Sequence, residues 1–285
     1  MNRTLLIAGV GYLGSELRDQ AHAAGWSVIG LSKSGEGDTI ACDLTSLPDL
    51  TAVAQSLSPA QQPDAIVHSA SSGRGGPEAY QAVFVDGCAN LLRTFPQSPL
   101  LFVSSTSVYG QTDGSTVTEE SPAHPDRETS RLLLQAEDTT LSAAGCVVRL
   151  AGIYGPGRSV ILQRFLNDNA GIEEDGQRIL NQIHRDDAAS AILHLLGQNT
   201  FPAGQLFNIA DSTPLHQIDC FRGLAQLFHK PLPPTVPRDL NRKRAWTNKR
   251  VSNAKLLQSG WSPRFPDFLQ AAPAIAPSLS SGRNA

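Results

Sequence analysis

Three glycines near the start of the chain constrain its fold most strongly. The run Gly9-Val10-Gly11-Tyr12-Leu13-Gly14 follows a predicted strand at residues 5–8 and begins a predicted helix at residues 12–24. A dinucleotide pyrophosphate binds backbone N–H groups at a helix N-terminus and needs positions without a Cβ, which glycines provide. The motif alone is a weak signal, but its place between a strand and a helix strengthens it. It predicts a cofactor site at Gly9, Gly11, Tyr12, Leu13 and Gly14, with a tight structural turn as the alternative.

The first half of the chain alternates apolar, strand-like runs with amphipathic helical stretches. This alternation is typical of a parallel sheet covered by helices on both faces. Strands are predicted at residues 5–8, 27–31, 39–41, 65–69, 100–104 and 146–150, and helices at residues 12–24, 47–57, 78–94 and 126–144. We therefore predict an α/β fold, with a doubly wound parallel sheet of the Rossmann type in a dinucleotide-binding domain at residues 1–155. A smaller C-terminal substrate lobe is predicted at residues 156–285.

The composition favours a small-molecule partner. The chain has 285 residues, of which 40% are hydrophobic and 17% charged, so it can bury a full core. Its net charge of -3 gives no general attraction to nucleic acid or to anionic membranes. The four cysteines lack metal-binding or disulfide spacing, and the first residues lack a secretory pattern. We expect a cytoplasmic protein with reduced cysteines, no bound metal, and no nucleic-acid or membrane partner.

The end of the second predicted strand indicates which dinucleotide is preferred. An Asp or Glu at this place would hold the adenosine ribose hydroxyls and disfavour a 2′-phosphate. The chain instead has Leu31-Ser32-Lys33-Ser34, with a cation between two hydroxyls. Ser32 and Lys33 are therefore predicted to bind the cofactor, with a slight preference for NADP over NAD. The alternative is that Lys33 is a solvated loop lysine.

Seven further motifs occur along the chain in a fixed order. Each is a weak signal alone, and their shared order and approximate spacing give them weight. They are Ala41-Cys42-Asp43-Leu44, Asp64-Ala65-Ile66-Val67-His68-Ser69-Ala70, Gly87-Cys88-Ala89-Asn90-Leu91-Leu92, Phe102-Val103-Ser104-Ser105-Thr106-Ser107-Val108-Tyr109-Gly110, Arg149-Leu150-Ala151-Gly152-Ile153-Tyr154-Gly155-Pro156-Gly157, Ile183-His184-Arg185-Asp186-Asp187 and Leu257-Gln258-Ser259-Gly260-Trp261-Ser262-Pro263.

Together these motifs resemble the extended short-chain dehydrogenases/reductases, the NAD-dependent epimerase/dehydratase family that acts largely on nucleotide sugars. The resemblance runs through nearly the whole chain. It implies that Asp43, with Leu44 beside it, lies near the adenine ring. It also implies that Ser69 and Ala70 lie beside the pyrophosphate and the ribose.

The reaction of this family depends on three side chains, of which the sequence keeps one. The resemblance implies a Ser or Thr that hydrogen-bonds the substrate, a Tyr that moves the proton, and a Lys four residues later that holds the nicotinamide ribose. Ser105 corresponds to the hydroxyl, with a strand-end serine that satisfies backbone groups as the alternative. Tyr-x-x-x-Lys occurs nowhere in the sequence. Aligned on Ser130, the tyrosine position falls at Arg127 and the lysine position at Arg131.

Two arginines at these positions change the chemistry that the site can perform. Arg131 keeps the positive charge and the hydrogen-bond donors that a ribose needs. Arg127 cannot accept a proton, because a guanidinium group keeps its charge and offers no lone pair. The usual proton transfer is therefore not available. Substitute bases nearby are His124, Asp126 and Glu128, and the alternative is that these residues are plain surface.

A basic stretch near the C-terminus is the candidate substrate contact. Residues 238–250 contain six basic residues and one acid. Three explanations stay open: a solvated loop, a clamp for a phosphate-bearing substrate, and a nucleic-acid patch. Aromatic interleaving, which single-strand binders use, is missing. In related epimerases this region meets the substrate diphosphate, which favours the clamp and makes Arg250 its candidate residue.

Two functions are compatible with these observations. The first is an NAD(P)-dependent oxidoreductase or epimerase that acts on a sugar-like or nucleotide-sugar substrate with altered proton-transfer residues. The second is a non-catalytic NAD(P)-binding sensor or regulatory protein. The family resemblance favours the first, and the missing tyrosine favours the second. The resemblance also gives a hint of a homodimer through the helices around residues 78–95 and 126–144.

Overall fold

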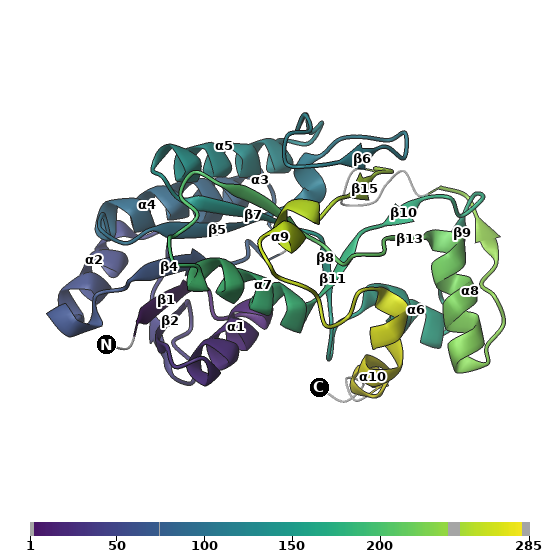
Figure 1. Ribbon diagram of the computed structural model, residues 1–285, viewed down its shortest axis with the longest axis horizontal. Helices are drawn as coiled ribbons and strands as arrows, with labels where there is room; N and C mark the ends of the chain where they lie inside the picture. Colours follow the sequence, from purple (N-terminus) through teal and green to yellow (C-terminus); the bar gives the residue numbers. More distant parts are fainter. Residues whose placement is uncertain (1–2, 74, 239–245, 281–285) are drawn as a thin grey trace. The chain divides into compact units, whose positions relative to one another are not determined.

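The protein forms two compact units, each assembled from several segments of the chain. A computed structural model describes residues 3–73, 75–238 and 246–280 (Figure 1). Unit 1 contains the described residues of Met1–Val108, His124–Arg149 and Ala189–Phe207, and unit 2 contains those of Tyr109–Ala123, Leu150–Ala188 and Asn208–Ala285. The predicted division between residues 155 and 156 stays a prediction, as does the homodimer.

Most strands of unit 1 form one seven-stranded sheet. Its order is β12-β7-β5-β4-β1-β2-β3. The chain places β2 and β3 on one side of β1 and then β4 on the other side, so the crevice at the carboxyl ends of β1 and β4 is the expected ligand position. β1 pairs in parallel with β2 and β4, β2 with β3, and β4 with β5. The predicted α/β fold with a doubly wound sheet is thereby confirmed. The strands are β1 (Thr4–Ala8), β2 (Ser27–Ser32), β3 (Thr39–Ala41), β4 (Ala65–His68), β5 (Leu100–Ser105), β7 (Cys146–Leu150) and β12 (Leu206–Ile209).

Helices cover both faces of this sheet, which explains why its central strands are buried and mostly apolar. In Figure 1, α4 and α5 lie on one side of the strands and α1 on the other. All residues of β1 and β4 are buried, as expected for parallel strands with both faces covered. The helices are α1 (Tyr12–Ala23), α2 (Leu47–Ser56), α3 (Pro77–Tyr80), α4 (Gly87–Thr94), α5 (Glu128–Ser142) and α7 (Arg185–Gly197), whose first residues belong to unit 2.

One helical stretch differs from its prediction. The sequence predicts a single helix over residues 78–94, whereas the structure has α3, a π-helix at Gln81–Asp86 and then α4. The fully buried ring of His68 lies beside this π-helix, with Nε2 2.9 Å from the Val83 carbonyl oxygen. Because a carbonyl only accepts, Nε2 carries the proton. Burial lowers the pKa of His68 to about 4, so the ring is neutral.

Unit 2 is built from helices and short strand pairs around an aromatic core. This core includes the buried rings of Tyr154, Phe165, Phe221 and Phe268. The strand pairs are β6 (Thr116–Val117) with β15 (Arg250–Val251), β8 (Gly152–Tyr154) with β11 (Gln182–His184), β9 (Ile172–Glu173) with β14 (Thr235–Val236), and β10 (Ile179–Leu180) with β13 (Leu215–His216). The helices are α6 (Val160–Leu166), α8 (Gln217–Phe228), α9 (Ala254–Gln258) and α10 (Phe268–Ser280).

The cysteines behave as predicted from their spacing. Cys42, Cys88, Cys146 and Cys220 are all free and buried, which confirms that they pack as reduced side chains. Within the described ranges, none of the helices has the length and hydrophobicity needed to cross a membrane. The same part of the chain holds no group of three or more His, Cys, Asp or Glu side chains that could bind a metal ion.

Candidate functional site

The glycine run forms a tight turn between β1 and α1 in unit 1. Gly9 has φ +107°, and a Cβ on it would lie 2.3 Å from Ala70 Cα, so only glycine fits there. A Cβ on Gly14 would lie 2.2 Å from the Gly9 carbonyl oxygen. A Cβ on Gly11, by contrast, would meet no atom within 4 Å, so the surface beside the helix start is open. The turn therefore has the open backbone face that a pyrophosphate requires.

The residues after β4 close this turn from the other side. The Ser69 hydroxyl donates a 2.9 Å hydrogen bond to the Gly9 carbonyl, and Ala70 packs against Gly9 itself. In the first turn of α1, Leu13 is buried while Tyr12 is half-buried. The structure thus brings together the predicted cofactor residues of the glycine run, Ser69 and Ala70 at the point where the sheet order reverses.

Lys33 and Asp43 form an ion pair beside the ends of β2 and β3. Their side-chain atoms Nζ and Oδ2 are 2.8 Å apart. The hydrogen bond from Lys33 lowers the pKa of Asp43 to about 2, and the same contact raises the pKa of Lys33. Ser32 shapes the loop that carries Lys33, because its hydroxyl contacts Thr39 Oγ1 at 2.7 Å and accepts from Gly35 N.

Leu44 lies next to this ion pair as a packing residue. Its side chain is buried, and its carbonyl accepts a 3.1 Å hydrogen bond from Asn90 Nδ2 on α4. The lysine predicted for the 2′-phosphate and the aspartate predicted for the adenine are therefore in direct contact. When a cofactor phosphate binds Lys33, this lysine contacts both the phosphate and the Asp43 carboxylate.

Ser105 ends β5 and lies in a group of hydroxyls. Its Oγ accepts a 3.2 Å hydrogen bond from the Ser107 backbone N–H, as the strand-end alternative predicts. The hydroxyl proton of Ser105 is not used in that bond. Ser107 Oγ in turn lies 3.5 Å from Ser130 Oγ on α5. This contact links the serine turn after β5 to the helix that carries the two arginines.

Arg127 and Arg131 lie at the N-terminal end of α5. Arg127 is the N-cap residue, with extended backbone and no side-chain capping bond. Arg131 is exposed, and its Nη1 donates a 2.8 Å hydrogen bond to the Asp126 carbonyl. Both guanidinium groups therefore add positive charge to a helix end that is already positive.

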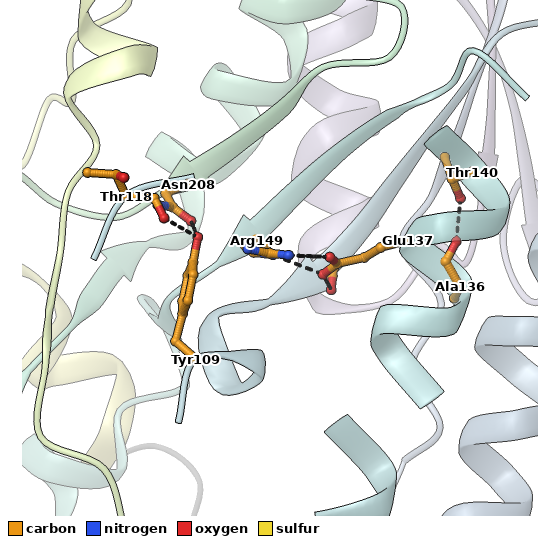
Figure 2. Close-up of polar contacts among 8 residues, drawn as sticks. Tyr109, Thr118, Ala136, Glu137, Thr140, Arg149 and Asn208 are labelled. Carbon is orange, nitrogen blue, oxygen red and sulfur yellow. Dashed lines mark hydrogen bonds and ion pairs between the residues drawn. The ribbon is translucent and has the colours of Figure 1, made fainter. Parts of the chain in front are cut away.

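The sequence missed a buried polar group behind these residues (Figure 2). Glu137 on α5 is 2% exposed and accepts hydrogen bonds from Arg149 Nη2 at 2.6 Å and from Ser104 Oγ at 2.5 Å. Ser104 precedes Ser105, so the carboxylate fixes the end of β5 relative to α5. One sequence feature could have indicated this group: Arg149 lies in the otherwise apolar strand β7, and a buried arginine needs a buried partner.

The family model for "NAD dependent epimerase/dehydratase family" matches residues 5–210 of the chain. The chain belongs to this family. The protein YeeZ of Escherichia coli K12 is 33% identical over 230 residues, which cover 75% of this chain and 79% of YeeZ.

Solved structures share the fold. One is a putative NAD-dependent epimerase/dehydratase from Methylobacillus flagellatus, which is 28% identical with a TM-score of 0.80 and covers 98% of this chain and 100% of its own. MoeE5 in complex with UDP-glucuronic acid and NAD has a TM-score of 0.80 at 18% identity, with 98% of this chain and 99% of MoeE5 covered, which shows the fold alone. Members of the family bind NAD or NADPH.

Tyr109, in the motif that follows β5, is fully buried (Figure 2). Its hydroxyl lies 2.9 Å from both the Thr118 carbonyl and Asn208 Oδ1. One hydroxyl proton therefore serves two acceptors. The Tyr109 carbonyl accepts a 2.7 Å hydrogen bond from Lys249 Nζ, which also contacts Thr247 Oγ1 at 3.1 Å. These contacts make Tyr109 a structural anchor of unit 2.

Lys249, a member of the basic stretch at residues 238–250, is a buried lysine. Burial, and then the charge of Arg178, lower its pKa to about 8. Arg250, the candidate substrate residue, belongs to unit 2 and donates to the Pro214 carbonyl at 3.2 Å. Arg238 pairs with Glu174 at 2.6 Å and stacks over Trp246. The predicted basic residues Arg242, Lys243 and Arg244 lie outside the described residues.

Proposed function

We propose that the protein is an NAD(P)-dependent oxidoreductase or epimerase that acts on a sugar-like or nucleotide-sugar substrate with altered proton-transfer residues. The glycine turn carries this proposal, because Gly9 and Gly14 leave no space for a Cβ while Gly11 faces open space. Family membership supports the chemistry. The complex of MoeE5 with UDP-glucuronic acid and NAD supports the substrate class by analogy of fold.

In this proposal a bound dinucleotide supplies hydride transfer, and the protein supplies orientation. The Ser105 hydroxyl, whose proton is free of the Ser107 contact, donates to a substrate oxygen. Arg131 holds the nicotinamide ribose with its guanidinium donors. Arg127 binds an acceptor group but takes no proton. A proton must therefore leave through a nearby base, for which the exposed His124 is the candidate.

For the cofactor we propose a preference for NADP. Lys33 is the cation at the end of β2, and its side chain is 85% exposed, so it can contact a 2′-phosphate without rearrangement of the core. Asp43 holds Lys33 in place in the absence of that phosphate. A small, phosphate-bearing substrate with Arg250 as a contact completes the proposal.

A sensor that binds NAD(P) without turnover is the second candidate. What favours it is the pair of arginines predicted at the family's tyrosine and lysine positions. Two permanent cations at a helix N-terminus suit the binding of an anionic group better than proton transfer.

One experiment distinguishes the two candidates. NADPH and NADH are titrated onto the protein, and nicotinamide absorbance is then followed with a panel of nucleotide sugars for the wild type and for Arg127→Tyr/Arg131→Lys. A matched control, Arg222→Lys, changes an exposed arginine on α8. Turnover by the wild type contradicts the sensor. Turnover by the double variant alone indicates a scaffold whose proton relay has been lost. If neither dinucleotide binds, both candidates are wrong.

A further inference from the structure

Three carboxyl groups and one tyrosine interact electrostatically within unit 2, apart from the residues of the candidate site. Asp211 follows β12 and is 3% exposed, and Tyr154 at the end of β8 is 2% exposed. Asp187 on α7 and Asp267, directly before α10, act electrostatically on both of them. Among the described residues, neither Asp211 Oδ1 nor the Tyr154 hydroxyl has a hydrogen-bond partner.

The other two carboxylates have defined structural partners. Asp187 accepts from the backbone N–H groups of Arg264 and Phe265 at 2.8 and 2.9 Å. Asp267 accepts from the N–H of Gln270 at 3.0 Å and thereby caps α10. Each of the two accepts backbone hydrogen bonds, although burial raises the pKa of Asp187. Asp211 is the third carboxyl of the cluster.

The groups that face Asp211 come from several packed elements and give it no counter-charge. They are the two aspartates, the Tyr154 hydroxyl on β8 and the thiol of Cys220 on α8. His184 on β11 interacts with Asp187, and its ring lies edge-on to Tyr154 at 5.4 Å. In the part of the chain that the structure describes, no ion pair includes Asp211. An ionised Asp211 would therefore be a buried charge that has the Thr213 backbone N–H as a hydrogen-bond donor but no counter-charge, beside two further carboxyl groups.

The position of the cluster connects this charge to a helix. The Pro266 carbonyl accepts from the backbone N–H groups of Ser212 and Thr213, both at 3.0 Å, so the segment after Asp211 is tied to the segment before α10. Phe268, the first residue of α10, packs edge-on against Tyr154 at 4.9 Å. Repulsion between Asp211 and Asp267 therefore acts on the start of α10.

We propose that Asp211 is a proton-controlled switch of unit 2, neutral when the start of α10 is docked and ionised when that start is loosened. This inference is independent of the proposed function. Burial, followed by the charge of Asp267, raises the pKa of Asp211 to about 8, which supports it. The unfolded aspartate ionises near pH 3.8, so unfolding releases a proton between that pH and about 8. The stabilisation of the folded state by the neutral acid is complete below about pH 3.8 and is lost as the pH rises to about 8.

Thermal unfolding as a function of pH tests the linkage. Asp211→Asn keeps the shape of the neutral acid and cannot ionise, and Asp219→Asn is the matched control because Asp219 is half-exposed on α8. Between pH 5 and pH 8 the wild type should lose roughly 5 °C or more of unfolding temperature relative to Asp211→Asn. Asp219→Asn should follow the wild type. Parallel curves for the wild type and Asp211→Asn would overturn the switch.

Two measurements on the folded protein complete the test. The side-chain carboxyl carbon of Asp211 should titrate near pH 8 by NMR in the wild type, which needs no variant to fold. A midpoint near pH 4 would overturn the proposal. Hydrogen exchange of residues 264–270, corrected for intrinsic rates, should lose about tenfold protection in the wild type as the pH passes 8. Equal protection on both sides of pH 8 contradicts the loosening of α10.

Discussion

Unit 1 and unit 2 both bury carboxyl groups in their cores, but they surround them differently. In unit 1, Glu137 receives the guanidinium of Arg149 and the hydroxyl of Ser104. In unit 2, Asp211 lies among carboxylates, and its Oδ1 has no hydrogen-bond partner within the described ranges. A buried charge with a matched partner fixes elements in one arrangement. A buried acid without a counter-charge makes the arrangement depend on pH instead.

Removal of the matched carboxylate should give the largest effect. Glu137→Gln leaves the Arg149 guanidinium buried without its counter-charge, so the free energy of unfolding should fall by about 3–5 kcal/mol. Denaturant unfolding followed by circular dichroism measures it. Asp138→Asn, the exposed neighbour on the same helix, should change little. A loss below about 1 kcal/mol would mean that the ion pair contributes no more than a surface pair.

Lys249 extends the comparison to a buried cation. Its pKa is lowered to about 8, so the folded state binds fewer protons than the unfolded state from about pH 8 to pH 10.5. The wild type should therefore gain stability relative to Lys249→Met across this window, by about 1.4 kcal/mol per pH unit. Urea unfolding at pH 7, 8, 9 and 10 measures the gain, with Lys255→Met as the control. The prediction is contradicted when the free energies of unfolding of the wild type and Lys249→Met differ by the same amount at all four pH values.

A neutral buried group should give a smaller effect that is independent of pH. Tyr109→Phe removes the hydroxyl that serves the Thr118 carbonyl and Asn208 Oδ1, and it keeps the ring. The expected loss is about 1–3 kcal/mol, because two buried acceptors lose one donor. Tyr80→Phe, a half-buried tyrosine on α3, is the control. Chemical unfolding at pH 6 and pH 8 should give the same loss; a loss that differs between them would place Tyr109 in a titrating network.

Removal of the exposed Lys33–Asp43 ion pair should have the smallest effect on the stability of the fold. Lys33→Ala should leave the unfolding temperature unchanged, because solvent screens the pair that Lys33 makes with Asp43. Binding should respond instead, with an NADPH dissociation constant raised about tenfold and that of NADH unchanged. Isothermal titration measures both. Equal changes for the two cofactors would remove the argument for NADP.

The sequence was informative where one segment decides the structure by itself. The glycine run is an example, because its strand, turn and helix are consecutive in the chain. The fold followed from the same kind of signal, since apolar strands alternate with helices. The π-helix at Gln81–Asp86 could not be predicted from its own residues, because it contacts His68, which belongs to the strand β4.

The candidate site was predictable only in part, for the same physical reason. Lys249 contacts the Tyr109 carbonyl, although the two residues are 140 positions apart in the sequence, and no local sequence pattern predicts such a contact. Asp211 resembles an ordinary loop aspartate until its burial is known. Ser105, Arg127 and Arg131 were found through a family resemblance, and their roles stay predictions.

The four cysteines offer a practical use. Burial raises the pKa of Cys42 to about 11, and those of Cys88 and Cys220 to about 12, and Cys146 is also buried. Thiolates are the species that react with alkylating reagents, so the native thiols should resist labelling. A single cysteine introduced at position 127 would then be the one reactive thiol of the folded chain. A fluorophore attached there would report dinucleotide and substrate binding directly, without knowledge of the reaction.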